Sequence, residues 1–223
     1  MNFREYPDRD MLALDLANQM AGELGAALRH EERVLFAVPG GTSPGPIFDV
    51  LSDVALDWDR VDIVLTDERW VPEDSPRSNT ALVRKRLLTG KAAAARLLPL
   101  RADTAEPEEA LDDLAAGLAD HLPIRVLLLG MGNDMHTASL FPGADRLEDA
   151  LAADAPVLMP MRAPGAEEPR ITFTAPILRG AMATHILIFG PDKRAALQRA
   201  ARLSPAEAPV SVVLDDATVH WCD

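Results

Sequence analysis

The sequence is poor in cysteine and has no long hydrophobic segment. Cys222 is the only cysteine among 223 residues, so no disulfide can form within one chain. A single cysteine is compatible with a reducing compartment. The N-terminal segment is rich in charge and lacks the apolar stretch of a signal peptide. No apolar run approaches the roughly 20 residues needed to cross a bilayer. We therefore expect a cytoplasmic protein with no membrane partner.

Basic residues are also scarce. The chain has 22 Lys and Arg against 35 Asp and Glu, a formal net charge of −13. Nucleic-acid binding requires clustered positive charge, and the longest basic run is Arg84-Lys85-Arg86, which fits the solvated face of a helix. We therefore expect no nucleic-acid partner. An anionic substrate would have to be captured by local cations and backbone amides, because the overall field repels it.

Several well-known site motifs are absent. The sequence has no H-x-x-x-H or C-x-x-C spacing for zinc and no G-K-[ST] phosphate loop. It also lacks the G-x-G-x-x-G turn of dinucleotide-binding proteins. We therefore expect neither a metal nor an organic cofactor.

Strand-like and helix-like segments alternate along the chain, which predicts a single α/β domain over residues 1–223 with a mainly parallel sheet covered on both faces. A proline- and glycine-containing stretch, Pro156–Pro169, is predicted to be a loop. Ser43 is predicted to be a helix N-cap, with Pro44 at the first helical position. The expected helices are Leu12–Leu28, Pro44–Leu56, Ser78–Leu88, Glu106–His121 and Asp192–Leu203. The expected strands are Val34–Val38, Val61–Thr66, Leu97–Leu100, Ile124–Leu129, Ile171–Thr174, His185–Phe189 and, as a final edge strand, Thr218–Trp221.

Four polar motifs follow four of the predicted strands. They are Gly40–Ser43, Asp67–Arg69, Gly130–His136 and Gly190–Lys193. In an open α/β sheet, ligands bind beyond the carboxyl ends of the strands. The four motifs therefore predict one composite site.

The segment Gly40–Ser43 has the composition of a phosphate cradle, because its glycines let the backbone approach an anion closely. The expected donors are the amides of Gly41, Thr42 and Ser43 and the hydroxyls of Thr42 and Ser43. An ordinary strand-to-helix turn is the alternative. Lys193 falls in the first turn of a predicted helix, where a cation opposes the helix dipole. A bound phosphate or Asp192 would compensate that charge, and a solvated surface lysine is the other possibility.

His136 is the candidate catalytic residue. Its imidazole can act as a base near neutral pH, and Asp134 lies two residues before it in a glycine-containing loop. A structural histidine is the alternative. Ser139 is expected to support the site rather than act as a nucleophile. The remaining histidines lack such a setting and are expected to be ordinary.

Asp67-Glu68-Arg69 places three charges at a strand end. An internal ion pair is one explanation, because buried charges must be paired. In the other, Asp67 orients Arg69 or a substrate hydroxyl. Arg170 can face the same edge if its strand runs antiparallel, and a surface arginine is the alternative.

The segment Gly130–Gly143, GMGNDMHTASLFPG, resembles the G-x-G-x-D-G-H-T-A-S-L-F-P signature of the 6-phosphogluconolactonases. Further segments match that family in the same order along the chain: GGTSP from Gly40, DERWVP from Asp67 followed by Ser78-Asn79, Arg170-Ile171-Thr172 and Gly190–Lys193. The resemblance implies the Rossmann-like fold shared with glucosamine-6-phosphate deaminases and ribose-5-phosphate isomerases. It implies hydrolysis of 6-phospho-D-glucono-1,5-lactone, a phosphorylated sugar lactone, by a monomer or weak homodimer. It also implies active-site roles for Arg69 and Arg170 and phosphate binding by Lys193.

One position departs from the family pattern, because Met135 stands where the family has glycine between Asp and His. Glycine there commonly signals a positive φ or a close backbone approach. Since the polar residues of every motif are present, we expect an active site in which Met135 has a negative φ and packs beside the site.

Two other functions fit parts of the sequence. An aldose-ketose isomerase or deaminase acting on an amino-sugar phosphate has a similar fold and phosphate loop. That family carries a glutamate after its histidine, whereas Thr137–Pro142 contains no carboxylate, which disfavours an isomerase or deaminase.

A catalytically silent sugar-phosphate sensor is the second alternative. Such modules usually accompany a DNA-binding domain, for which this chain has no room before its first strand.

Overall fold

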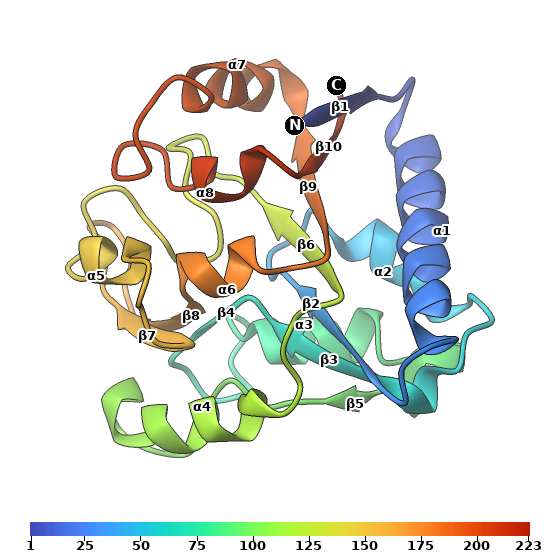
Figure 1. Ribbon diagram of the computed structural model, residues 1–223, viewed down its shortest axis with the longest axis horizontal. Helices are drawn as coiled ribbons and strands as arrows, with labels where there is room; N and C mark the ends of the chain where they lie inside the picture. The colour runs from blue at the N-terminus through green and yellow to red at the C-terminus, as the bar shows by residue number, and fades with distance from the viewer.

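The computed structural model describes residues 1–223 and contains a seven-stranded sheet in which every pair of neighbouring strands is parallel. The strand order is β1-β10-β9-β6-β2-β3-β5 (Figure 1). The strands are β1 (Asn2–Glu5), β2 (Val34–Val38), β3 (Val61–Leu65), β5 (Arg96–Leu97), β6 (Val126–Gly130), β9 (Ala183–Phe189) and β10 (Thr218–Cys222).

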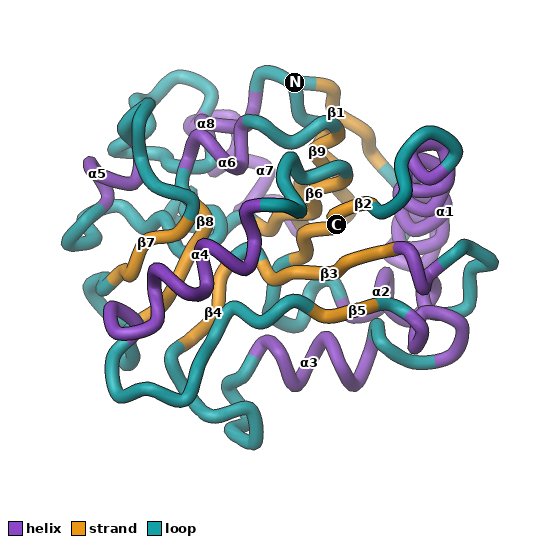
Figure 2. The backbone as a smooth tube through the Cα atoms, turned by 60° about the horizontal axis from the view of Figure 1, so that its bottom comes forward, coloured by secondary structure: helices purple, strands orange, loops and turns teal.

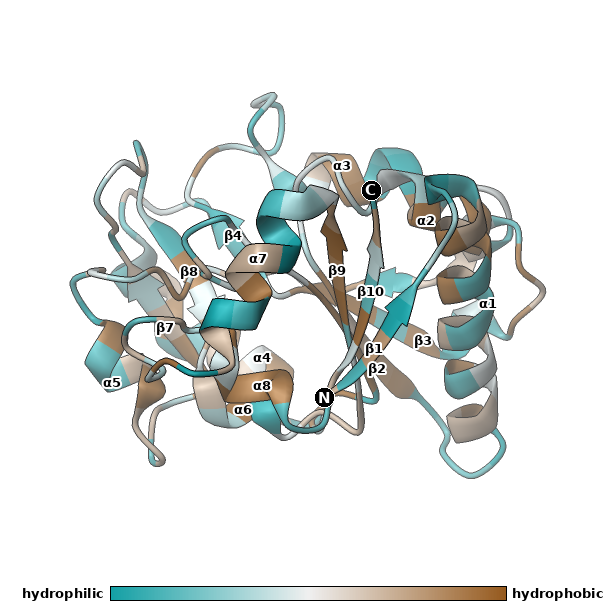
Figure 3. Cartoon of the chain, turned by 90° about the horizontal axis from the view of Figure 1, so that it is seen from above, coloured by the Kyte–Doolittle hydropathy of each residue, from teal (hydrophilic) through white to brown (hydrophobic).

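Helices cover both faces of this sheet, with α1 and α2 on one side and α4, α6 and α7 on the other (Figure 3). The predicted α/β fold with a mainly parallel sheet is therefore confirmed. No helix is long and apolar enough to span a membrane. The helices are α1 (Arg9–Leu28), α2 (Gly45–Ser52), α3 (Asn79–Arg86), α4 (Leu111–Ala119), α5 (Leu147–Leu151), α6 (Ala175–Arg179), α7 (Gly190–Ala200) and α8 (Ser211–Leu214).

A second, three-stranded antiparallel sheet lies at one end of the molecule (Figure 2). Its order is β4 (Asp67–Arg69), β8 (Arg170–Phe173), β7 (Leu158–Met161). The strand at Ile171 was predicted, and it runs antiparallel to β4, as Arg170 requires if it is to face the site. The other two strands were not predicted, and β7 lies inside the segment expected to be a loop.

The sequence patterns explain the main elements. All five residues of the apolar strand β2 are buried, as expected inside a parallel sheet. All five residues of β3 are buried too, and its one charged residue, Asp62, is paired with Arg33 and Arg96. In α1 the leucines and Met20 that recur every fourth residue are buried against the sheet, which is the period of an amphipathic helix. The Asp8 side chain accepts a hydrogen bond from the Met11 amide and caps this helix.

Several details of the predicted elements are wrong. β10 is not an edge strand, because β1 pairs with it and forms the edge; the mixed sequence of β1 gave no strand signal. α2 begins at Gly45, because Pro44, not Ser43, occupies the N-cap position and its carbonyl accepts the first helical hydrogen bond. The helix ends at Ser52, before the predicted end at Leu56. The expected helix Glu106–His121 divides into a 3₁₀ turn and α4.

A chain of polar side chains, buried at His185 and His220, links α1 to the strands β9 and β10. The Tyr6 hydroxyl donates to Asp15 (2.7 Å) and lies 2.8 Å from Nδ1 of His220. Nε2 of His220 is 3.1 Å from Nδ1 of His185, whose Nε2 is 2.7 Å from the Glu23 carboxylate. Burial, together with the neighbouring His185, lowers the pKa of His220 to about 3. These histidines are structural, and their polar contacts tie the sheet to α1.

The buried His220 predicts a pH dependence of stability. Between pH 6.5 and about 3 the unfolded chain binds a proton at His220 that the folded chain does not. The free energy of unfolding should therefore fall with falling pH, by up to about 1.4 kcal/mol per pH unit for one proton. In His220→Gln this slope should be smaller, and in the exposed control His30→Gln it should be unchanged. Urea unfolding at several pH values measures it; a slope in His220→Gln equal to the parent's contradicts the assignment.

Candidate active site

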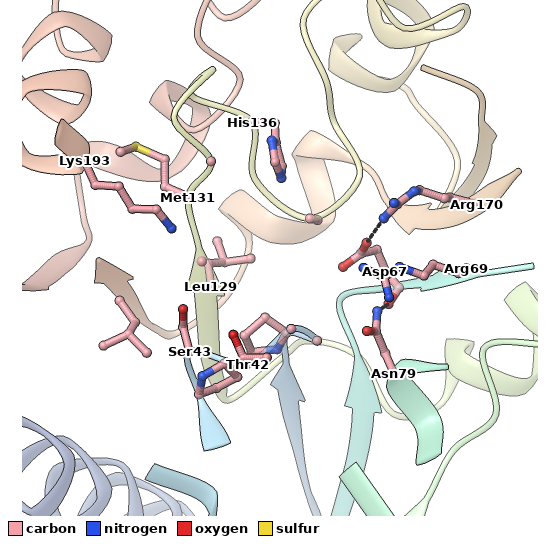
Figure 4. Close-up of a pocket in the computed structure, with 18 residues that line it drawn as sticks. Thr42, Ser43, Asp67, Arg69, Asn79, Leu129, Met131, His136, Arg170 and Lys193 are labelled. Carbon is pink, nitrogen blue, oxygen red and sulfur yellow. Dashed lines mark hydrogen bonds and ion pairs between the residues drawn. The ribbon is translucent and has the colours of Figure 1, made fainter. Parts of the chain in front are cut away.

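A cavity of about 310 Å³ opens at the carboxyl ends of β2, β6 and β9, beside the small sheet (Figure 4). All four polar motifs contribute to its wall, so the structure brings together the residues that the sequence placed in one composite site. Of the predicted site residues, only Asp134 is outside the wall. The lining residues are Pro39–Pro44, Asp67, Arg69, Asn79, Leu129–Gly132, His136, Ala138, Arg170, Leu187 and Lys193.

The loop after β2 forms one side of the cavity. Gly41 has φ +81°, a conformation that favours glycine. Gly40 has a different constraint, because a Cβ there would lie 2.0 Å from the Asn79 side chain. The Asn79 amide donates to the Asp67 carbonyl and lines the cavity. Asn79 belongs to the segments that match the family, but it was not predicted as a site residue. The absence of a side chain at Gly40 leaves the space that Asn79 occupies.

Lys193 extends into the cavity from the first turn of α7 (Figure 4). Its burial lowers the pKa of the ammonium group, and the negative charge of Asp134 partly opposes that effect. Lys193 makes no hydrogen bond or ion pair within the chain, with Asp192 or any other residue, so the ammonium group is free to bind an anion.

His136 and Asp134 form a pair, of which the His136 ring lines the cavity. Nδ1 of His136 lies 2.6 Å from Oδ1 of Asp134. An ionised carboxylate can only accept hydrogen bonds, so Nδ1 carries the proton and Nε2 of the neutral ring has a free lone pair. Asp134 thereby fixes the tautomer in which His136 can accept a proton. Gly132 makes room for the pair, since a Cβ there would lie 2.3 Å from Nδ1 of His136.

The prediction for Met135 is wrong, because its φ is +67°. Its amide donates to the Gly132 carbonyl (3.0 Å), and the Gly132 amide donates to the His136 carbonyl (3.0 Å). A loop closed by both bonds requires a left-handed residue at this position. The Met135 side chain packs against the hydrophobic core and does not line the cavity. Ala138 also has a positive φ, +48°, which was not foreseen.

Met135 offers a direct test of this backbone conformation. Alanine and glycine both remove the side chain, but only alanine retains the strain of a positive φ. At ordinary positions alanine is the more stable of the two by about 0.5–1 kcal/mol. We expect the reverse here, with Met135→Gly more stable than Met135→Ala by about 1 kcal/mol. Denaturant unfolding of the two variants measures the difference, and a more stable alanine variant would disprove the positive φ.

The charges of the small sheet are arranged differently from the expectation. Asp67 does not orient Arg69: its Oδ2 accepts from the Ser139 hydroxyl (2.5 Å) and lies 3.8 Å from NH1 of Arg170. The Arg69 guanidinium instead donates to the Arg77 carbonyl (2.7 Å) and is 3.7 Å from Glu168. Burial lowers the pKa of Arg170. Arg69 and Arg170 nevertheless both line the cavity.

Glu68 has a structural role that sequence reasoning missed. It is 1% exposed and accepts hydrogen bonds from the backbone amides of Arg69 (2.7 Å), Asn79 (3.0 Å) and Thr80 (2.7 Å). Glu68 therefore fastens the start of α3 to β4. An anion at a helix N-terminus is favourable, and this contact keeps Asn79 at the cavity.

The family of the chain follows from its sequence. Residues 7–221 match the family described as glucosamine-6-phosphate isomerases/6-phosphogluconolactonase. The chain belongs to this family. A Mesorhizobium japonicum member named 6-phosphogluconolactonase is 41% identical over 218 residues, covering 97% of this chain and 91% of that protein. A Pseudomonas aeruginosa member of the same name is also 41% identical, covering 94% of this chain and 90% of that protein.

Solved structures of family members share the fold. A 6-phosphogluconolactonase from Shewanella baltica superposes with a TM-score of 0.96 at 30% identity, covering 100% of this chain and 98% of that one. A monomeric glucosamine-6-phosphate deaminase gives a TM-score of 0.82 at 14% identity, covering 100% of this chain and 97% of that one. The second likeness concerns the fold alone. It agrees with the fold that the motifs implied.

Proposed function

We propose that this protein hydrolyses 6-phospho-D-glucono-1,5-lactone to 6-phospho-D-gluconate, the second step of the oxidative pentose phosphate pathway. The observation that carries the proposal is the arrangement of a carboxylate-bound imidazole and an unpaired lysine around one cavity. A substrate with a reactive carbonyl at one end and a phosphate at the other fits these two groups. Relatives at 41% identity over nearly the whole chain carry the name of this activity.

In the proposed complex the phosphate lies between Lys193 and the loop of Gly40–Ser43. The amides of Gly41, Thr42 and Ser43 and two hydroxyls are available as donors, and Lys193 supplies a positive charge. Charge-assisted hydrogen bonds of this kind are roughly twice as strong as neutral ones. With the phosphate held there, the lactone ring extends toward His136.

His136 acts as the general base in this proposal. Nε2 takes a proton from a water molecule as the water oxygen attacks C1 of the lactone. The bond between C1 and the ring oxygen then breaks, and the imidazolium returns the proton to that oxygen. Asp134 stabilises the imidazolium that forms between the two steps. The products are one carboxylic acid and one hydroxyl, and the acid releases its proton to solvent.

Negative charge develops on the carbonyl oxygen during the attack. Arg69 and Arg170 line the cavity on the side of the small sheet and are the positive groups available to stabilise it. Their placement in a partly buried wall strengthens this effect, because charges interact more strongly away from water. The loop amides are the other available donors. Water is the only co-reactant that the scheme requires.

The direct experiment follows acid release from freshly generated 6-phosphogluconolactone with and without the protein, since the lactone also hydrolyses spontaneously. We expect the parent to accelerate hydrolysis and His136→Ala to lose a factor of about 10²–10⁴ in rate, the usual contribution of a general base. Circular dichroism should show an unchanged fold. A parent rate equal to the background rate would refute the function. Turnover of His136→Ala within about threefold of the parent would refute the role of His136.

Lys193 is tested through substrate discrimination. Removing a charged hydrogen-bond partner costs roughly 1.5–3 kcal/mol, so Lys193→Ala should raise the KM for the phosphorylated lactone at least about tenfold. The KM for glucono-1,5-lactone should change little, because that substrate has no phosphate. Lys85→Ala, which removes an exposed lysine on α3, is the matched control. Equal effects on both substrates would show that Lys193 does not bind the phosphate.

A further inference from the structure

The reacting groups of the site stand on two different sheets. His136 lies in the loop that follows β6 of the seven-stranded sheet, whereas Arg170 is the first residue of β8 in the small sheet (Figure 4). No backbone ladder joins the two sheets. The backbone of Thr66 connects the sheets at one point, through hydrogen bonds with Val38 and Phe173. Side chains that touch both the imidazole and the guanidinium further restrict the distance and orientation between them.

Phe141 is such a side chain. Its ring centroid lies 4.2 Å from that of the His136 imidazole, with 36° between the ring planes. The Cζ atom of Arg170 lies 5.2 Å from the same phenyl centroid, within the range of a cation–π contact. Phe141 does not line the cavity. Its ring contacts both residues that do line the cavity.

Both neighbours have few polar restraints of their own. Nε of Arg170 is buried without a hydrogen-bond partner, and its NH1 is 3.8 Å from the nearest carboxylate oxygen, that of Asp67. The His136 ring has one hydrogen bond within the chain, to the half-exposed side chain of Asp134. A single bond at Nδ1 leaves the tilt of the ring about that bond undetermined. Packing against Phe141 removes this freedom.

The turn that precedes Phe141 is hydrogen-bonded to both sheets. In the turn before it, the Thr137 hydroxyl donates to the carbonyl of Gly130 at the end of β6 (2.9 Å). The Ser139 hydroxyl donates to Asp67 on β4 (2.5 Å), and its amide donates to the Thr172 hydroxyl on β8 (3.2 Å). Ser139 is fully buried. The turn thus spans the two sheets and presents Phe141 at a fixed place.

We propose that Phe141 is a positioning residue. Its ring fixes the positions of the His136 imidazole and the Arg170 guanidinium relative to each other for the attack on the lactone carbonyl. This inference rests on the proposed lactonase function. The ring is not part of the cavity wall, which includes Lys193 and the loop of Gly40–Ser43. Its loss should therefore affect turnover rather than binding of the phosphate.

The experiment compares kcat and KM of the parent with those of Phe141→Leu and Phe141→Tyr. Misplacement of reacting groups by about 1 Å can cost on the order of 10²-fold, so Phe141→Leu should lower kcat about tenfold to a hundredfold and leave KM within about threefold. Phe141→Tyr keeps the ring and should retain kcat within about threefold of the parent. The matched control is Phe3→Leu. Phe3 is also half-buried, with Arg194 5.3 Å over its ring and Trp221 beside it, but lies away from the cavity.

A double-mutant cycle separates positioning from simple destabilisation. If Phe141 acts by placing Arg170, Phe141→Leu should lower kcat less in an Arg170→Met background than in the parent, because coupled sites are not additive. Melting curves establish that each variant is folded at the assay temperature. The proposal is overturned if Phe141→Leu keeps the parent's kcat, if Phe141→Tyr loses as much as Phe141→Leu, or if the two effects multiply independently. A parent without lactonase activity would instead refute the proposed function, which is a separate result.

Discussion

The site depends on the parallel register of β2, β6 and β9. Because these three neighbouring strands run in the same direction, the turns that follow Val38, Gly130 and Phe189 leave the sheet at one edge. One cavity is therefore lined by three groups that lie far apart in the sequence: the loop of Gly40–Ser43, the His136 imidazole and Lys193. Reversing any one of these strands would remove its motif to the other edge. The polar residues are therefore useful only in this topology.

The small sheet supplies the charged residues on one side of the cavity. It contributes Asp67, Arg69 and Arg170 to the cavity wall, and the hydrogen bond between Ser139 and Asp67 ties it to the loop of His136. The cavity contains three cationic side chains and one carboxylate, in a protein with a net charge of −13. At the other end of the large sheet, by contrast, the buried Asp62 is paired with Arg33, Arg96 and His121. The cations of the site are less fully paired, which suits them to an anionic ligand.

Much of the architecture could be predicted from local pattern. The buried apolar runs and the four-residue spacing in α1 follow from simple periodicity, and polar motifs after parallel strands must share an edge. Other features depend on contacts distant in sequence. β10 is an interior strand only because the weakly patterned β1 pairs with it. The positive φ of Met135 follows from the two hydrogen bonds that close its loop. The proximity of Asn79 to Gly40, and of Phe141 to Arg170, is likewise visible only after folding.

In the proposed complex, the phosphate and the reacting carbonyl lie at opposite ends of one cavity. A crystal structure with bound 6-phosphogluconate tests that assignment most directly. The phosphate oxygens should lie about 3 Å from Nζ of Lys193 and from the amides of Thr42 and Ser43, and the C1 carboxylate should lie beside Nε2 of His136. A phosphate seated on Arg69 and Arg170, with Lys193 left unoccupied, would contradict the orientation and with it the proposed role of His136.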